Sequence, residues 1–81
     1  MKVLLFGVTR DIVGEAALSI PSAEAGELAT VGALKAFLRH RYPALDHLSS
    51  LAVAVNKAYA TDTDPLDTQD EIALIPPVSG G

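Results

Sequence analysis

One segment of this 81-residue chain has the spacing of an amphipathic helix, and short apolar runs surround it. Apolar residues recur at helical intervals from Val31 to Tyr42, with Thr30 as a good N-cap and Pro43 as the stop. A single helix with one apolar stripe must bury that stripe against another layer. The sequence therefore predicts one helix lying across one face of a β-sheet. The stripe consists of Val31, Leu34, Phe37, Leu38 and Tyr42.

Five short runs are typical of β-strands, and two of them are the most apolar. Because Lys2 to Gly7 and Glu71 to Ile75 are these two, we expect them to pair at the centre of the sheet. The predicted helix lies between them in the sequence, so the connection is long enough for the two strands to run parallel. The other three predicted strands are Glu15 to Ile20, Leu51 to Val55 and Ala58 to Ala60.

Turn and loop signals separate these elements. One helical turn is expected at Asp11 to Val13, closed by Gly14, and Asn56-Lys57 is a predicted turn because Asn tolerates positive φ. The predicted surface loops are 22–29, 44–50 and 61–69. The expected order is β-β-α-β-β-β. That order corresponds to an α+β roll of the β-grasp, ubiquitin-like type, in which a mixed sheet carries one main helix across one face and ends in an extended Gly-Gly tail.

The composition allows one small domain and argues against several classes of function. We place the β-grasp domain at residues 1–77 and a flexible tail at 78–81. The absence of cysteine excludes disulfides, Cys-ligated zinc and thiol catalysis. A formal net charge of −4 disfavours nucleic-acid binding, which needs a basic face. No run is apolar enough to cross a bilayer, and the apolar start lacks a signal-peptide cleavage site, so we expect a cytoplasmic protein with no membrane partner.

The side chains offer no convincing catalytic or metal-binding pattern. His40 and His47 lack the spacing of a metal site, and the acidic residues between positions 62 and 71 lack the central glycine of a calcium loop. Ser79 has no histidine base near it for a hydrolase triad. We therefore expect that the chain binds no metal or cofactor and that it is not an enzyme on its own.

The C-terminus remains as the candidate reactive group. Pro76 and Pro77 stop the last strand, and the glycines at the end present the α-carboxylate on a thin stalk that a partner can enclose. The four residues of 78–81, if extended, reach about 13 Å. A carboxylate is a poor electrophile, but its mixed anhydride with AMP can be attacked by sulfur to leave a thiocarboxylate. An idle, frayed terminus is the alternative interpretation.

The face of the sheet opposite the helix is predicted to be an uncovered apolar surface. Phe6 and Ile75 are expected on it, together with Leu4 and Tyr59. An exposed apolar patch usually marks a surface that binds a partner. Arg10, in the first connection, is either an ordinary surface charge or a contact to an acidic group of that partner.

Several short motifs are distributed along the whole chain. They are Phe6 in the first strand, Arg10-Asp11-Ile12-Val13-Gly14, Thr30-Val31, Val55-Asn56, Pro65-Leu66, Asp70-Glu71 and the terminal Pro76-Pro77-Val78-Ser79-Gly80-Gly81. The terminal motif is the most specific of them. With these motifs the chain resembles, nearly end to end, the small sulfur-carrying subunits of molybdopterin synthase.

The resemblance implies a mechanism centred on Gly81, with Gly80 beside it in the tail. A ubiquitin-activating-like adenylyltransferase would use ATP to adenylate Gly81, and a sulfur donor would then supply the thiocarboxylate. The tail would enter the large synthase subunit, which provides the catalytic side chains and passes the sulfur to cyclic pyranopterin monophosphate. The complex implied is a heterotetramer that serves molybdenum cofactor biosynthesis.

The resemblance also implies which residues contact a partner. By match of position, Phe6, Tyr59 and Ile75 lie in the apolar contact, and the family often has an aromatic residue where Ile75 stands. The full set of expected partner contacts is Phe6, Arg10, Tyr59, Ile75, Pro76, Pro77, Val78 and Ser79.

Two alternatives to this function stay open on the sequence. A sulfur carrier for thiamine thiazole synthesis, or for another thiolation pathway, would use the same tail chemistry with a different partner. A ubiquitin-like module that acts by binding alone would have an idle terminus.

Overall fold

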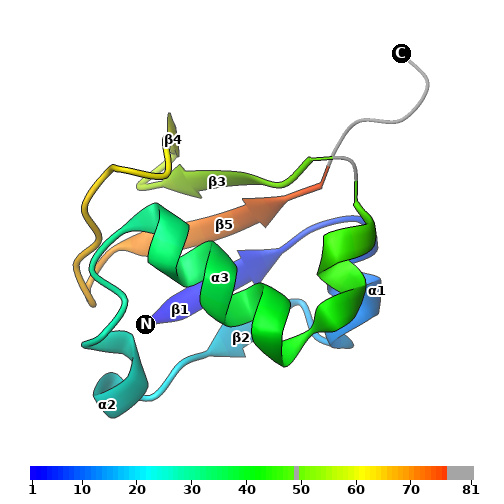
Figure 1. The fold of residues 1–81 in the computed structure, drawn as a ribbon, viewed down its shortest axis with the longest axis horizontal. Helices are drawn as coiled ribbons and strands as arrows, with labels where there is room; N and C mark the ends of the chain where they lie inside the picture. The colour runs from blue at the N-terminus through cyan, green and yellow to red at the C-terminus, as the bar shows by residue number, and fades with distance from the viewer. Residues whose placement is uncertain (49, 77–81) are drawn as a thin grey trace.

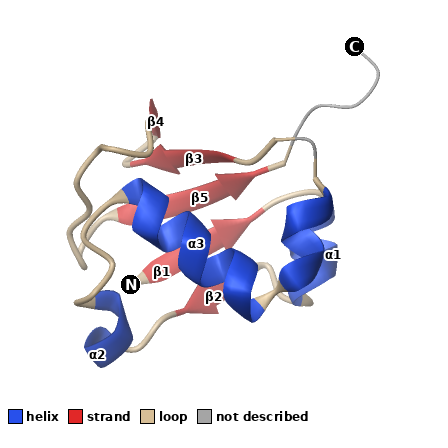
Figure 2. Ribbon diagram, viewed as in Figure 1, coloured by secondary structure: helices blue, strands red, loops and turns tan. Residues whose placement is uncertain are grey.

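The computed structural model describes residues 1–48 and 50–76 of the chain. Strands and helices alternate along its first half, and strands dominate its second half (Figure 1; Figure 2). The elements are β1 (Lys2–Leu5), α1 (Val8–Val13), β2 (Ala17–Ser19), α2 (Ser22–Ala25), α3 (Val31–Arg41), the 3-10 helix η1 (Pro43–His47), β3 (Ala52–Val55), β4 (Ala58–Ala60) and β5 (Glu71–Ile75). The tail predicted at 78–81 lies outside the described residues, as does Pro77.

The described strands form one sheet with the order β2-β1-β5-β3-β4. The central pair β1 and β5 is parallel, whereas β2 pairs antiparallel with β1, and β3 pairs antiparallel with both β5 and β4. Helix α3 crosses one face of this sheet (Figure 1). The prediction of a β-grasp sheet with a parallel central pair is therefore confirmed.

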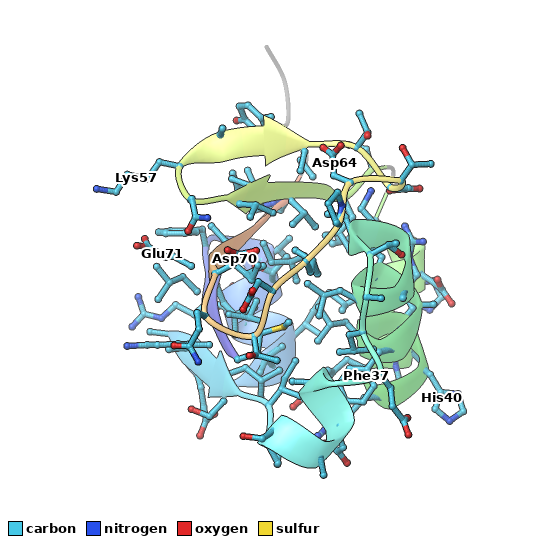
Figure 3. The ribbon with its side chains drawn as sticks, turned by 90° about the vertical axis from the view of Figure 1, so that its left-hand side faces the viewer. Phe37, His40, Lys57, Asp64, Asp70 and Glu71 are labelled. Atoms are coloured by element: carbon cyan, nitrogen blue, oxygen red, sulfur yellow. The ribbon has the colours of Figure 1, made fainter. Side chains whose placement is uncertain are left out.

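The core lies between α3 and the covered face of the sheet. Val31, Leu34 and Leu38 of α3 are fully buried, because they occupy the side of the helix that faces the strands. Burial of a side chain of this size contributes about 1.5–3 kcal/mol. Phe37 and Tyr42 of the predicted stripe are only half-buried and pack at the margin of the core, while His40 points away from the sheet (Figure 3). The sheet contributes Val3, Leu5, Leu18, Val53, Ile72 and Leu74.

Two predicted loops contain short helices, and this is a correction to the sequence analysis. Helix α2 lies within the predicted loop 22–29, and η1 occupies most of the predicted loop 44–50. Each segment buries one or two apolar residues, Ala25 and Leu28 in the first and Leu45 in the second. So few apolar positions cannot establish a helical period in the sequence, and the helices form because these residues reach the core.

Helix α1 is longer than the single turn predicted at 11–13, and β2 is shorter than predicted. Gly7 precedes α1, and Gly14 ends it in the left-handed conformation with φ 89°, where its N–H donates to the Arg10 carbonyl oxygen at 2.7 Å. Strand β2 covers Ala17–Ser19 rather than 15–20. Within the described residues, none of the helices has the length and apolarity that a membrane span requires.

Candidate functional site

The sheet has a second face that α3 does not cover, and small or apolar side chains form its middle. In β1 and β5, alternate residues point away from the core because strand side chains alternate between the faces. The pairing register places five residues in one row across this open face. The row runs Ala17, Leu4, Ala73, Ala54 and Tyr59 from β2 to β4. Hereafter "open face" means this row with Lys2, Glu71, Ala52 and Ile75, its neighbours along the strands.

The apolar residues predicted for the uncovered face of the sheet lie on or beside the open face. Tyr59 is 76% exposed, and Phe6, which directly follows β1, is 50% exposed. Leu4 and Ile75 are half-buried. The apolar residues that the sequence analysis selected thus lie on the same side of the sheet, and a partner contact through them stays a prediction.

The described chain ends where β5 meets the turn between β1 and α1. Pro76 is half-buried, and a Cβ atom added to Gly7 would lie 3.1 Å from the Pro76 Cγ atom. Gly7 has φ +55°, which favours glycine. Val8, the next residue, is 41% exposed and was not selected from the sequence. No periodic signal in the sequence distinguishes Val8, which directly follows Gly7, the residue that lies against Pro76.

Arg10 is exposed on α1, at the same end of the molecule. Within residues 1–48 and 50–76, no ion pair of its guanidinium is found. Both interpretations made from the sequence, a plain surface charge and a contact to an acidic partner group, remain compatible with this position.

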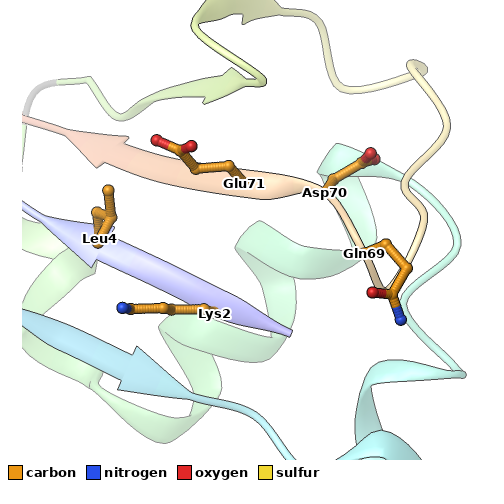
Figure 4. Close-up of a pocket in the computed structure, with 5 residues that line it drawn as sticks. All are labelled: Lys2, Leu4, Gln69, Asp70 and Glu71. Atoms are coloured by element: carbon orange, nitrogen blue, oxygen red, sulfur yellow. The ribbon is translucent and has the colours of Figure 1, made fainter.

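The opposite end of the open face is polar and slightly hollowed. A shallow depression of about 440 Å³ is lined by Lys2, Leu4, Gln69, Asp70 and Glu71 (Figure 4). Lys2 and Glu71 are direct neighbours across β1 and β5, so opposite charges face the same side there. The open face therefore has a polar end at the start of the central strands and an apolar end near Pro76.

Asp70 holds the polar end together through hydrogen bonds. The Asp67 backbone N–H donates to its carboxylate at 2.9 Å, and the Asn56 side-chain amide donates at 3.0 Å. The first of these, helped by the second, lowers the pKa of Asp70 below its ordinary value. The pKa of Asp70 is lower in the folded protein than in the unfolded chain. These hydrogen bonds therefore stabilise the fold when the pH is above the pKa of the unfolded chain, and this stabilisation is lost as the pH falls through the pKa of the folded protein.

No metal centre is found in the described part of the chain. There, no three His, Cys, Asp or Glu side chains are grouped so that they could hold a metal ion. His40 and His47 are both exposed. The remaining predicted site residues, Pro77, Val78, Ser79, Gly80 and Gly81, lie outside the described residues.

A comparison with protein families identifies the chain. The model of the ThiS family matches residues 3–81, which includes the last residue, Gly81. The chain belongs to the ThiS family. Together with the relatives described next, this match confirms the resemblance to molybdopterin synthase sulfur-carrier subunits that the motifs along the chain suggested.

Relatives of this ThiS-family chain share its full length. A molybdopterin synthase sulfur carrier subunit from Arabidopsis thaliana is 36% identical over 84 residues, which span all of this chain and 82% of the relative. The small archaeal modifier protein 1 of Methanosarcina acetivorans superimposes with a TM-score of 0.76 at 25% identity, covering 99% of this chain and 94% of that protein.

A third similar protein has been solved in a complex. It belongs to the complex of subunits 1 and 2 of the molybdopterin-converting factor from Helicobacter pylori, and it matches with a TM-score of 0.62 and 27% identity. The match covers 99% of this ThiS-family chain and 96% of that chain. The β-grasp fold predicted from the sequence is thus shared with a small archaeal modifier protein and with a subunit of a molybdopterin-converting factor.

Proposed function

We propose that this chain is the sulfur-carrier subunit of a molybdopterin synthase and that its reactive group is the Gly81 carboxylate. One observation carries the proposal: the similarity to such subunits extends over the whole chain, and the family match includes Gly81. A module that acts by binding alone would not require its sequence to match the family as far as Gly81.

The chemistry takes place at the terminal carbonyl carbon in two steps. A carboxylate oxygen of Gly81 first attacks the α-phosphorus of ATP on an activating enzyme, which forms the acyl-adenylate and releases pyrophosphate. Sulfide released by a donor then attacks the carbonyl carbon as HS⁻ and loses its proton to solvent. The new C–S bond forms as the C–O bond to AMP breaks, and AMP leaves with the electron pair. The product is the thiocarboxylate, and ATP is consumed by the activating enzyme rather than bound by this chain.

The folded body has a different task, which is to present the tail. The apolar end of the open face lies next to Pro76, so a partner that covers Phe6 and Ile75 is also close to the origin of the tail. Residues 78–81, if extended, span about 13 Å, which is enough to reach into a neighbouring active site. The acid, base and electrostatic stabilisation of sulfur transfer must then come from the partner. The similarity to a subunit solved in a two-subunit complex supports a larger synthase subunit as that partner.

Intact-mass measurement tests this proposal. The full chain is incubated with a ubiquitin-activating-like adenylyltransferase, ATP and a sulfur donor, and we expect the mass gain of one oxygen replaced by sulfur. A variant that lacks Gly81 is the matched control, because its body is unchanged and its terminus ends in Ser79-Gly80. We expect this control to support no synthase activity. An unchanged mass of the wild-type chain under conditions that convert a known carrier contradicts the proposal.

The ThiS family match favours a second candidate, a carrier that delivers sulfur for thiazole synthesis. Its tail chemistry is identical, so the mass measurement does not separate the two. Reconstitution does: the thiocarboxylated chain, mixed with a large molybdopterin synthase subunit and cyclic pyranopterin monophosphate, is expected to yield molybdopterin. A chain that forms the thiocarboxylate but yields no molybdopterin serves the second candidate function.

A further inference from the structure

Thr9 is the one fully buried polar side chain among the described residues. Its hydroxyl accepts a hydrogen bond from the Phe6 backbone N–H at 3.1 Å and donates to the Phe6 carbonyl oxygen at 2.5 Å. The Leu74 carbonyl oxygen lies 3.4 Å from the same hydroxyl, within its hydrogen-bonding reach. One side chain of α1 therefore connects the end of β1 with the end of β5, which is 65 residues away in the sequence.

A second contact joins the same two segments. Gly7, two residues before Thr9, lies so close to the Pro76 ring that a Cβ atom at position 7 would be 3.1 Å from the ring Cγ. Such a separation is tighter than nine in ten real Cβ contacts, so a side chain at position 7 would require the Pro76 ring to shift by a few tenths of an ångström. Gly7, Thr9, Leu74 and Pro76 together are called the exit clamp below.

We propose that the exit clamp fixes the direction in which the C-terminal tail leaves the sheet, and that Thr9 is a positioning residue for delivery of Gly81. This inference rests on the proposed function, since direction matters only for a tail that must enter a partner's site. Strand β1 ends at Leu5, whose pairing with Leu74 is the last one between β1 and β5, so beyond Leu74 only the pairing of Ile75 with Ala52 of β3 still holds β5. The Thr9 hydroxyl and the Gly7 contact act where the pairing with β1 stops.

A fixed exit lowers the cost of insertion. A tail whose origin is loose samples more directions, and binding must then restrict that freedom. The restriction is the same in the ground state and the transition state, so its loss raises KM and leaves kcat unchanged. If loss of the clamp frees a few backbone torsions at the start of the tail, the KM for the chain is expected to rise about three- to ten-fold.

A pair of Thr9 variants tests the exit clamp. Thr9→Val keeps the shape of the side chain and removes the hydroxyl, whereas Thr9→Ser keeps the hydroxyl. The steady-state KM and kcat for activation of the full chain by the adenylyltransferase are measured, together with the ¹⁵N heteronuclear NOE of Leu74 and Ile75. For Thr9→Val we expect a raised KM, an unchanged kcat and a lower NOE at both amides, and for Thr9→Ser we expect wild-type values.

The controls separate the inference from the proposed function. Thr68→Val makes the same chemical change at an exposed position before β5 and is expected to alter neither readout. If Thr9→Val does not fold, Gly7→Ala serves as the second variant. Its added methyl group would push against the Pro76 ring, and we expect it to raise KM in the same way. A folded Thr9→Val with wild-type KM and NOE overturns the clamp. A wild-type chain that is never activated overturns the proposed function, while the NOE comparison still decides whether Thr9 orders the end of β5.

Discussion

At the turn between β3 and β4, two consecutive non-glycine residues adopt left-handed backbone conformations, Asn56 with φ 51° and Lys57 with φ 70°. Two-residue hairpins of this kind match the twist of the flanking strands. Asn56 is suited to the position, because its side-chain oxygen also accepts a hydrogen bond from the Glu71 backbone N–H at 3.0 Å. The Lys57 side chain is exposed and extends away from the turn into solvent, so it does not offset the strain of its left-handed backbone (Figure 3).

Replacing Lys57 by glycine is therefore expected to stabilise the protein. Relief of the left-handed strain outweighs the greater freedom of glycine in the unfolded chain, and the free energy of unfolding should rise by about 0.5–1 kcal/mol. Denaturant unfolding of Lys57→Gly measures this change. Lys57→Ala removes the charge and keeps the strain, so it should show no gain. A Lys57→Gly variant less stable than the wild type would mean that the turn is not strained.

Among the elements, α3 has a side-chain cap at its N-terminus and an ion pair close to it. The Thr30 hydroxyl accepts a hydrogen bond from the Ala33 backbone N–H at 3.2 Å, as the sequence predicted. Near the same end, Lys35 forms an ion pair with Asp62 at 2.7 Å, and its side chain is only 15% exposed. The hydrogen bond from Lys35, with its charge, lowers the pKa of Asp62, so this pair loses its effect as the pH falls through that lowered value.

Loss of the N-cap should destabilise α3. In Thr30→Ala the Ala33 N–H loses its side-chain partner, and the free energy of unfolding should fall by about 1 kcal/mol. Thr30→Ser retains the hydroxyl and should stay within a few tenths of a kcal/mol of the wild type. Thermal or chemical unfolding of both variants checks the difference. Equal losses in the two variants would assign the effect to packing of the Thr30 methyl group instead of the cap.

At the scale of the whole molecule, the two faces of the sheet differ in what covers them. One face is covered by α3 and supplies the stability, while the open face contributes little to the core and remains free for contact. Along that open face, polarity changes from the Lys2 and Glu71 end to the end near Ile75 and Pro76. A partner that covers the apolar end is placed beside the end of β5, which is the arrangement that the proposed sulfur delivery requires.

Substitution of Tyr59 should separate binding from stability. Tyr59→Thr keeps a good strand former on β4 and removes a ring that is 76% exposed, so unfolding should change by less than about 1 kcal/mol. Loss of an aromatic contact should weaken the affinity for the large synthase subunit by about ten-fold, measured by calorimetry. His40→Ala, on exposed α3 surface, is the control and should bind normally. Unchanged affinity of Tyr59→Thr would remove Tyr59 from the partner surface.

By itself the sequence determined the fold class, the parallel central pair and the capped end of α3. Those features depend on local signals, such as apolar period, turn residues and the N-cap, which act over a few neighbouring positions. It also selected Phe6, Leu4, Tyr59 and Ile75, because strand alternation assigns them to the face that α3 leaves open. Partner contact at these residues, and the chemistry assigned to Gly81, stay predictions.

Only the tertiary structure decided which individual residues of distant segments come into contact. Helices α2 and η1 form around a few buried residues that leave no period in the sequence, and the contacts of Thr9 with Leu74 and of Gly7 with Pro76 join positions more than 60 residues apart. A threonine in a short helix and a glycine just before that helix are ordinary when considered alone. They gain their role because the parallel pairing of β1 and β5 brings the start of the chain to the place where its tail begins.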